Sequence, residues 1–89
     1  MRAVPRISEF YGIVIWMYRP DHSPPHFHAQ YGDMWAQVAI DDLRVLNGRL
    51  PARALRLVRA WARLHSDELA EHWRRAQAHE LLLPITPLP

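Results

Sequence analysis

Residues 26–40, HFHAQYGDMWAQVAI, contain two strand-like segments on either side of a turn. Gly32 and Asp33 form a dipeptide that is typical of turns. Residues 34–40 alternate between two faces with the two-residue period of a strand. Residues 26–31 are expected to form the strand before the turn. This stretch therefore predicts two neighbouring antiparallel strands.

The segments on both sides extend this pair to a small meander. Residues 10–19, FYGIVIWMYR, are rich in aromatic and β-branched side chains, which favour a strand, and Pro20 ends it. Residues 21–25 are expected to form a loop. Residues 43–46 are compatible with a short last strand before the turn signal Asn47-Gly48. We therefore expect an antiparallel sheet of three or four strands.

The second half of the chain has helical periodicity. Pro51 suits the first turn of a helix. Apolar residues and histidines then recur every three or four positions, at Leu55, Val58, Ala62, His65, Leu69, His72 and Ala76. We expect one long helix or two shorter ones, with a kink near His65–Ser66. The apolar tail, residues 81–89, is expected to pack in an extended form against the protein's own sheet, and most of the four tryptophans are expected in the core.

Length and composition narrow the class of protein. The 89 residues make a single domain, 1–89, and the order of its elements predicts an α+β fold with the helices on one face of the sheet. Because the chain has no cysteine, any metal must be bound by nitrogen and oxygen. No apolar run is long enough to span a membrane, and the basic start, residues 1–6, lacks the apolar stretch of a signal peptide. We therefore expect a cytoplasmic protein.

All eleven basic residues are arginines, and the net charge of +2 is too small to indicate nucleic-acid binding by itself. Five of them form a stripe at the start of the helical half: Arg49, Arg53, Arg56, Arg59 and Arg63. Such a stripe can contact phosphates or an acidic partner, and Arg53, Arg56 and Arg63 are the candidates for this contact. A solvated helix face has the same pattern.

The histidine–proline run DHSPPHFH, residues 21–28, is the strongest functional signal. On a strand, His26 and His28 would lie on one face, about 6.5–7 Å apart along the backbone, with Phe27 in the core. His22 could fold back across the prolines as a third ligand of a metal such as zinc, and Asp21 could bind the metal or orient a ring. A metal-free polar site and purely structural roles are the alternatives.

A second group, His65, Glu68 and His72, would share one face of a continuous helix. Glu68 could hold an imidazole in one tautomer or complete a metal site with the histidine–proline run. A histidine on an apolar stripe is more often a half-buried residue with one satisfied nitrogen, and this is the alternative for both histidines.

These motifs closely resemble the prokaryotic proteins of domain-of-unknown-function family 4160. The resemblance is carried by ISEFYGIVI at residues 7–15, Met17-Tyr18, DHxPPHFHA at residues 21–29, Tyr31-Gly32, Gly48, Leu50-Pro51, Trp61, Leu64-His65, Glu68-Leu69 and Trp73. It implies functional positions at Asp21, His22, Pro24, Pro25, His26, Phe27, His28, His65 and Glu68, but not at His72. It also implies a small partner protein encoded by a neighbouring gene, in a toxin–antitoxin-like pair.

We interpret the chain as a component of such a two-gene module. His22, His26 and His28 are the predicted catalytic residues, and Asp21, His65 and Glu68 are predicted to support them. If the protein is an enzyme, cleavage of RNA or nucleotide phosphodiesters is the first class to test. One histidine would act as general base and another as general acid, and an arginine would neutralise the negative charge that develops on the phosphoryl group. The alternative is a non-catalytic binding module whose histidines organise a metal or a partner-protein surface. The sequence leaves open whether the protein is an enzyme and whether it forms homo-oligomers.

Overall fold

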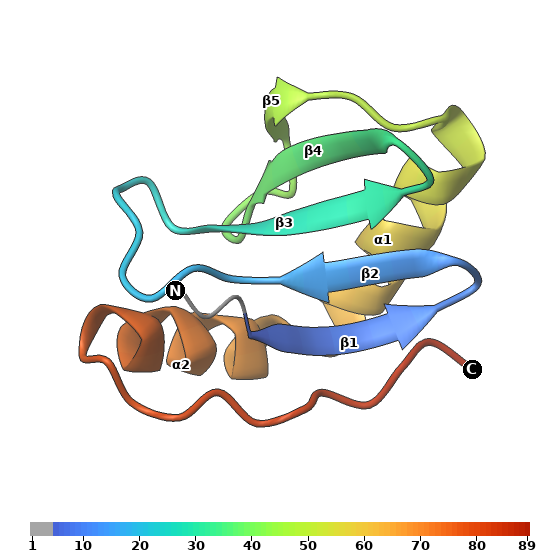
Figure 1. The fold of residues 1–89 in the computed structure, drawn as a ribbon. Helices are drawn as coiled ribbons and strands as arrows, with labels where there is room; N and C mark the ends of the chain where they lie inside the picture. Colours follow the sequence, from blue (N-terminus) through green and yellow to red (C-terminus); the bar gives the residue numbers. More distant parts are fainter. Residues whose placement is uncertain (1–4) are drawn as a thin grey trace.

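Five antiparallel strands form one sheet in which every strand pairs with its neighbours in the chain, in the order β1-β2-β3-β4-β5 (Figure 1). The computed structural model describes residues 5–89, so the first four residues of the basic start lie outside it. The strands are β1 (Arg6–Phe10), β2 (Ile13–Trp16), β3 (His26–Tyr31), β4 (Met34–Ala39) and β5 (Val45–Gly48). The stretch 26–40 forms the expected hairpin, with His26 opposite Ala39 and Tyr31 opposite Met34.

The expected sheet of three or four strands is wrong by at least one strand, because the segment 10–19 is not a single strand. Tyr11 and Gly12 adopt positive φ angles of 50° and 78° and form a turn. Phe10 therefore pairs with Ile13, and residues 6–10 become an additional strand. The last strand also begins later than expected, at Val45, because Leu43 has a φ of 63° and belongs to the turn after β4.

Two helices follow the sheet, α1 (Ala52–Leu64) and α2 (Ser66–Gln77). The break lies at His65, whose φ of −129° and ψ of 28° are not helical, so the expected kink is confirmed. Figure 1 shows α1 crossing behind the strands. Val58 and Trp61 of α1 and Leu69 of α2 pack with the inward side chains of the sheet into one hydrophobic core, which includes Ile7, Ile13, Ile15, Phe27, Ala29 and Val38. Neither helix of the described residues is long and apolar enough to cross a membrane.

Neither of the two helices in the described part of the chain lies over the centre of the other face of the sheet (Figure 1). Because side chains alternate along a strand, the residues between the core positions point to this face, which we call the open face: Val14, Trp16, His28, Gln30, Trp35 and Gln37. Trp16 is opposite His28, and Gln30 is opposite Trp35. The expectation that most tryptophans lie in the core is therefore wrong: Trp61 is fully buried, whereas Trp35 is 44% exposed.

The tail runs beside β1 as an extended segment (Figure 1). The Ile85 N–H donates to the Ile7 carbonyl at 2.6 Å, and the Trp61 indole N–H donates to the Thr86 carbonyl at 2.9 Å. Leu82 and Ile85 are buried in the core. The tail thus packs against the protein's own sheet, as expected, and covers the β1 edge.

Candidate metal centre

Asp21, His26 and His28 meet at the end of the open face, and we call them the Asp–His–His cluster. One potential ligand atom from each lies within 4.8 Å of the others. Asp21 Oδ2 is 3.1 Å from His26 Nε2 and 3.2 Å from His28 Nε2. Both histidines are buried, so the carboxylate oxygen faces two imidazoles with little access to water.

Strand β3 positions the two histidines. His26 and His28 are two residues apart and share a face, whereas Phe27 between them is fully buried in the core. The Trp16 ring stacks on His28 with the ring centroids 5.0 Å apart. The Trp73 ring of α2 lies against the His26 ring, with the ring centroids 5.4 Å apart. Neighbouring strand and helix residues therefore fix the orientation of both imidazoles.

The loop that carries Asp21 is held by the end of α2. Gln77 accepts a hydrogen bond from the Asp21 N–H at 3.0 Å and donates one to the Asp21 carbonyl at 2.7 Å. The Arg19–Pro20 and Ser23–Pro24 peptide bonds of the loop are cis. Sequence reasoning missed Gln77, because nothing in its own segment indicates a contact with a residue 56 positions away.

The backbone partner of His26 determines which ring nitrogen donates a hydrogen bond. His26 Nδ1 lies 2.7 Å from the Pro24 carbonyl, which can only accept, so Nδ1 carries a proton. In a neutral imidazole Nε2 then has a lone pair, and this atom is buried without a hydrogen-bond partner. Nε2 lies 3.1 Å from Asp21 Oδ2, and two acceptors at this distance attract each other only when a proton or a metal cation lies between them. Imidazoles that bind metals commonly donate their other N–H to a backbone carbonyl in this way.

The local environment favours the forms of Asp21 and His28 that can bind a metal. Burial raises the pKa of Asp21, but the hydrogen bonds from His28 and the His22 N–H, and the charges of the nearby imidazoles, bring it below the ordinary value. Burial lowers the pKa of His28, and its hydrogen bond to Asp21 offsets this only in part. A carboxylate and a neutral imidazole are the forms in which these residues coordinate metal ions.

His22, the expected third ligand, lies outside the Asp–His–His cluster. Its backbone N–H donates to Asp21 Oδ1 at 2.9 Å, while its side chain is 92% exposed and its Nδ1 is 3.4 Å from the same oxygen. Asp21, rather than His22, is therefore the third potential ligand beside His26 and His28. The exposed imidazole remains next to the site.

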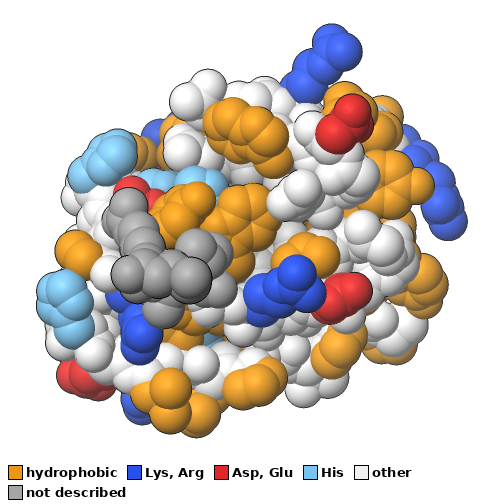
Figure 2. Space-filling view, viewed as in Figure 1, with side chains coloured by type: hydrophobic (Ala, Val, Ile, Leu, Met, Phe, Trp, Pro, Cys, Tyr) orange, Lys and Arg blue, Asp and Glu red, His pale blue; other side chains and the backbone are white. Residues whose placement is uncertain are grey.

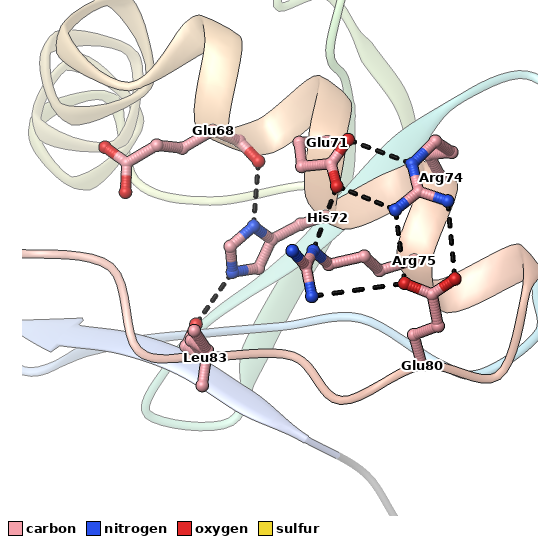
Figure 3. A network of polar contacts seen from close by, with 7 residues as sticks. All are labelled: Glu68, Glu71, His72, Arg74, Arg75, Glu80 and Leu83. Atoms are coloured by element: carbon pink, nitrogen blue, oxygen red, sulfur yellow. Dashed lines mark hydrogen bonds and ion pairs between the residues drawn. The ribbon is translucent and has the colours of Figure 1, made fainter.

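The other predicted residues lie apart from the cluster. His65 Nδ1 and Glu68 Oε1 pair with each other at 2.6 Å at the junction of the helices. Among the described residues, none of the contacts of the cluster involves either of them. His72 Nδ1 and Nε2 face the Glu68 and Leu83 carbonyls at 2.8 and 2.7 Å, which ties α2 to the tail (Figure 3).

The candidate arginines Arg53, Arg56 and Arg63 are exposed on α1, the helix that covers the opposite face of the sheet. Arg53 lines a separate cavity of about 60 Å³ beside Tyr11 and Tyr31. None of the three arginines lines the cavities beside the histidines. Their contact with phosphate or with a partner stays a prediction.

The Asp–His–His cluster borders a shallow groove of about 620 Å³, lined by Tyr18, Pro20, Asp21, His22, His28 and Gln37. Figure 2 shows this face, with histidine and acidic side chains together near the β2–β3 loop and hydrophobic side chains gathered over the strands. Two imidazole nitrogens and one carboxylate form a donor set that suits zinc and iron(II), and three protein ligands leave positions for water or substrate.

Comparison with known proteins identifies a family without assigning an activity. The family model described as Domain of unknown function (DUF4160) matches residues 12–74, which include the whole Asp–His–His cluster and the His65–Glu68 pair. No curated protein and no solved structure matches the chain.

Proposed function

The chain belongs to the DUF4160 family, and from the chemistry of its site we propose that Asp21, His26 and His28 bind one divalent transition metal and that this centre hydrolyses phosphodiester bonds of RNA or nucleotides. The observation that carries the metal site is His26 Nε2, which is buried without a hydrogen-bond partner and lies 3.1 Å from Asp21 Oδ2. A metal ion between these groups would satisfy both.

The residues around the cluster support the proposed hydrolysis. A metal held by Asp21, His26 and His28 would lower the pKa of a bound water and would polarise a phosphoryl oxygen. Trp16, Trp73 and the buried strand β3 hold the imidazoles in place, which favours metal binding by preorganisation. His22 lines the same groove and exposes an imidazole for proton transfer to the leaving oxygen.

Metal binding is tested with protein that carries no histidine tag. We expect one Zn²⁺ per chain by titration calorimetry, and a loss of affinity of at least about tenfold in Asp21→Asn and His26→Ala. His65→Ala is the matched control, because it also removes a histidine paired with a carboxylate but lies outside the cluster. Equal affinity of all three variants and the wild type, or no binding at micromolar zinc, would exclude the centre.

A proton on His26 Nε2 is the competing explanation for the short contact with Asp21. Nitrogen-15 NMR of the imidazoles distinguishes a proton on Nε2 from a metal bound there. Zinc is expected to change the Nε2 resonances of His26 and His28 while His26 Nδ1 keeps its proton. A His26 ring that still carries a proton on Nε2 in the presence of zinc, with or without one on Nδ1, would remove the argument from the lone pair.

Hydrolysis is tested separately, with the zinc-loaded protein and a fluorescent single-stranded RNA. We expect cleavage that is lost in Asp21→Asn and weakened in His22→Ala. Metal binding without turnover would instead support the alternative of a non-catalytic binding module. The predicted partner protein and the role in a toxin–antitoxin-like pair have no counterpart among the described residues and stay predictions.

A further inference from the structure

The groove beside the Asp–His–His cluster continues along the open face of the sheet. A second cavity of about 340 Å³ shares Tyr18, His28 and Gln37 with the first and adds Trp16, Gln30 and Trp35. A third, of about 500 Å³, shares Trp16, Tyr18 and Gln30 and ends at Arg6. These shared residues join the three cavities into one path from the cluster to β1, which we call the long groove.

The floor of the long groove combines aromatic rings with amides. Trp35 lies on β4, 44% exposed, and among the described residues its ring makes no contact with another aromatic ring. Its cross-strand partner is Gln30, and Gln37 follows two residues later on the same face. An exposed indole next to amide donors and acceptors suits a flat ring with polar edges better than an aliphatic surface, because the ring can stack while its edge forms hydrogen bonds.

Between its two ends the long groove is free of carboxylates among the described residues. Asp21, at the end that borders the cluster, is the only carboxylate among its lining residues in the described part of the chain. Arg6 supplies a cation at the far end, where it also forms an exposed ion pair with Glu9 at 3.6 Å. A ligand with flat rings and a negatively charged backbone matches both the aromatic floor and the Arg6 end of the long groove.

We propose that the long groove binds single-stranded RNA, with a base stacked on Trp35 and the phosphodiester backbone running toward the Asp–His–His cluster. The role of this RNA as substrate rests on the proposed function, whereas its binding does not. Exposed aromatic residues on the face of a small sheet bind single-stranded bases in this way in other folds, and each stacked base contributes measurable affinity.

The experiment uses metal-free protein in the presence of a chelator, so that binding is measured without hydrolysis. The probe is a short fluorescent single-stranded RNA of mixed sequence, followed by fluorescence anisotropy. Trp35→Ala is expected to weaken binding roughly five- to a hundredfold. Tyr31→Ala is the matched control, because Tyr31 is also an exposed ring, at 41%, but lines none of the three cavities of the long groove.

An abasic oligoribonucleotide of the same length separates stacking from charge. The proposal requires that it bind more weakly than the intact RNA and that Trp35→Ala have little further effect on it. Equal binding of both probes, no effect of Trp35→Ala, or no binding of RNA would overturn the proposal. A dimer that forms in solution and is dispersed by Trp35→Ala would also overturn it, because a second copy would then occupy the open face. Failure of zinc binding alone would leave RNA binding by the metal-free protein intact.

Discussion

Gly48, at the end of β5, has a backbone conformation and surroundings that exclude a side chain. Its φ is 73°, and a Cβ atom there would lie 2.3 Å from the Trp35 carbonyl oxygen of β4. The neighbouring atom belongs to the backbone of a paired strand, so it cannot move away without disturbing the β4–β5 register. Gly48 thus helps to hold the strand that carries Trp35.

We predict that Gly48→Ala lowers the free energy of unfolding by more than about 1 kcal/mol, since it combines strain at positive φ with a steric clash. Gly32→Ala is the matched control, because Gly32 also has a positive φ, 61°, but no atom within 4 Å of the added Cβ. Urea denaturation measures both. A loss in Gly48→Ala no larger than that in Gly32→Ala would show that the clash has no energetic effect.

At the level of single residues, sequence reasoning located the site but not all of its members. The spacing of His26 and His28 predicted their common face, because the period of a strand is local information. The choice between Asp21 and His22 could not be made this way. It depends on the path of the loop, which Gln77 of α2 fixes from a distant part of the sequence.

At the level of elements, the hairpin at residues 26–40 and the break at His65 were predictable, because Gly-Asp and the Ser-Asp-Glu start of α2 are local signals. The β1–β2 turn was not, since Tyr11 and Gly12 lie within a continuous aromatic and β-branched segment. Propensity averaged over such a segment conceals a two-residue turn. The strand that was not predicted, β1, matters for the site because it carries Arg6 at the end of the long groove.

The end of α2 carries an exposed ion-pair network that connects it to the start of the tail (Figure 3). Arg74 donates two hydrogen bonds to Glu71, at 2.9 and 2.8 Å, and Arg75 donates a third at 3.0 Å. Arg74 also reaches Glu80 at 3.1 Å. The hydrogen bonds from Arg74, with the charges of both arginines, lower the pKa of Glu71 to about 2.

Because the pKa of Glu71 is lower in the folded protein than its ordinary value of 4.5, its stabilising effect is complete above that value and is lost as the pH falls toward about 2. We predict that the unfolding free energy of the wild type decreases more steeply over this interval than that of Glu71→Gln, and that high salt reduces the difference. Denaturation at several pH values measures this. Asp33→Asn is the control, because it removes an exposed carboxylate that forms no ion pair with any described residue. A Glu71→Gln profile parallel to the wild type would contradict the prediction.

At the scale of the whole molecule, covering elements occupy one face and one edge of the sheet. The helices bury the inner face, and the tail pairs with β1 through Ile85 and Ile7. Among the described residues, neither the helices nor the tail cover the centre of the open face, and the Asp–His–His cluster lies at one end of it. This arrangement follows from contacts between distant segments, which is why the sequence indicated an apolar tail and a one-sided sheet but not which edge the tail covers.

The tail is expected to stabilise the whole fold rather than only its own end. Ile85 is 2% exposed and belongs to the hydrophobic core, whereas Leu83, two residues earlier, is 53% exposed. We predict that Ile85→Ala lowers the free energy of unfolding by about 2–5 kcal/mol, the usual range for a buried aliphatic side chain. Leu83→Ala should stay within about 0.5 kcal/mol of the wild type. Thermal and urea denaturation provide both values, and similar losses in the two variants would mean that the tail does not dock in solution as described. If Ile85→Ala releases the tail, the uncovered β1 edge should also make the variant associate in size-exclusion chromatography, because an unpaired edge strand can pair with another chain.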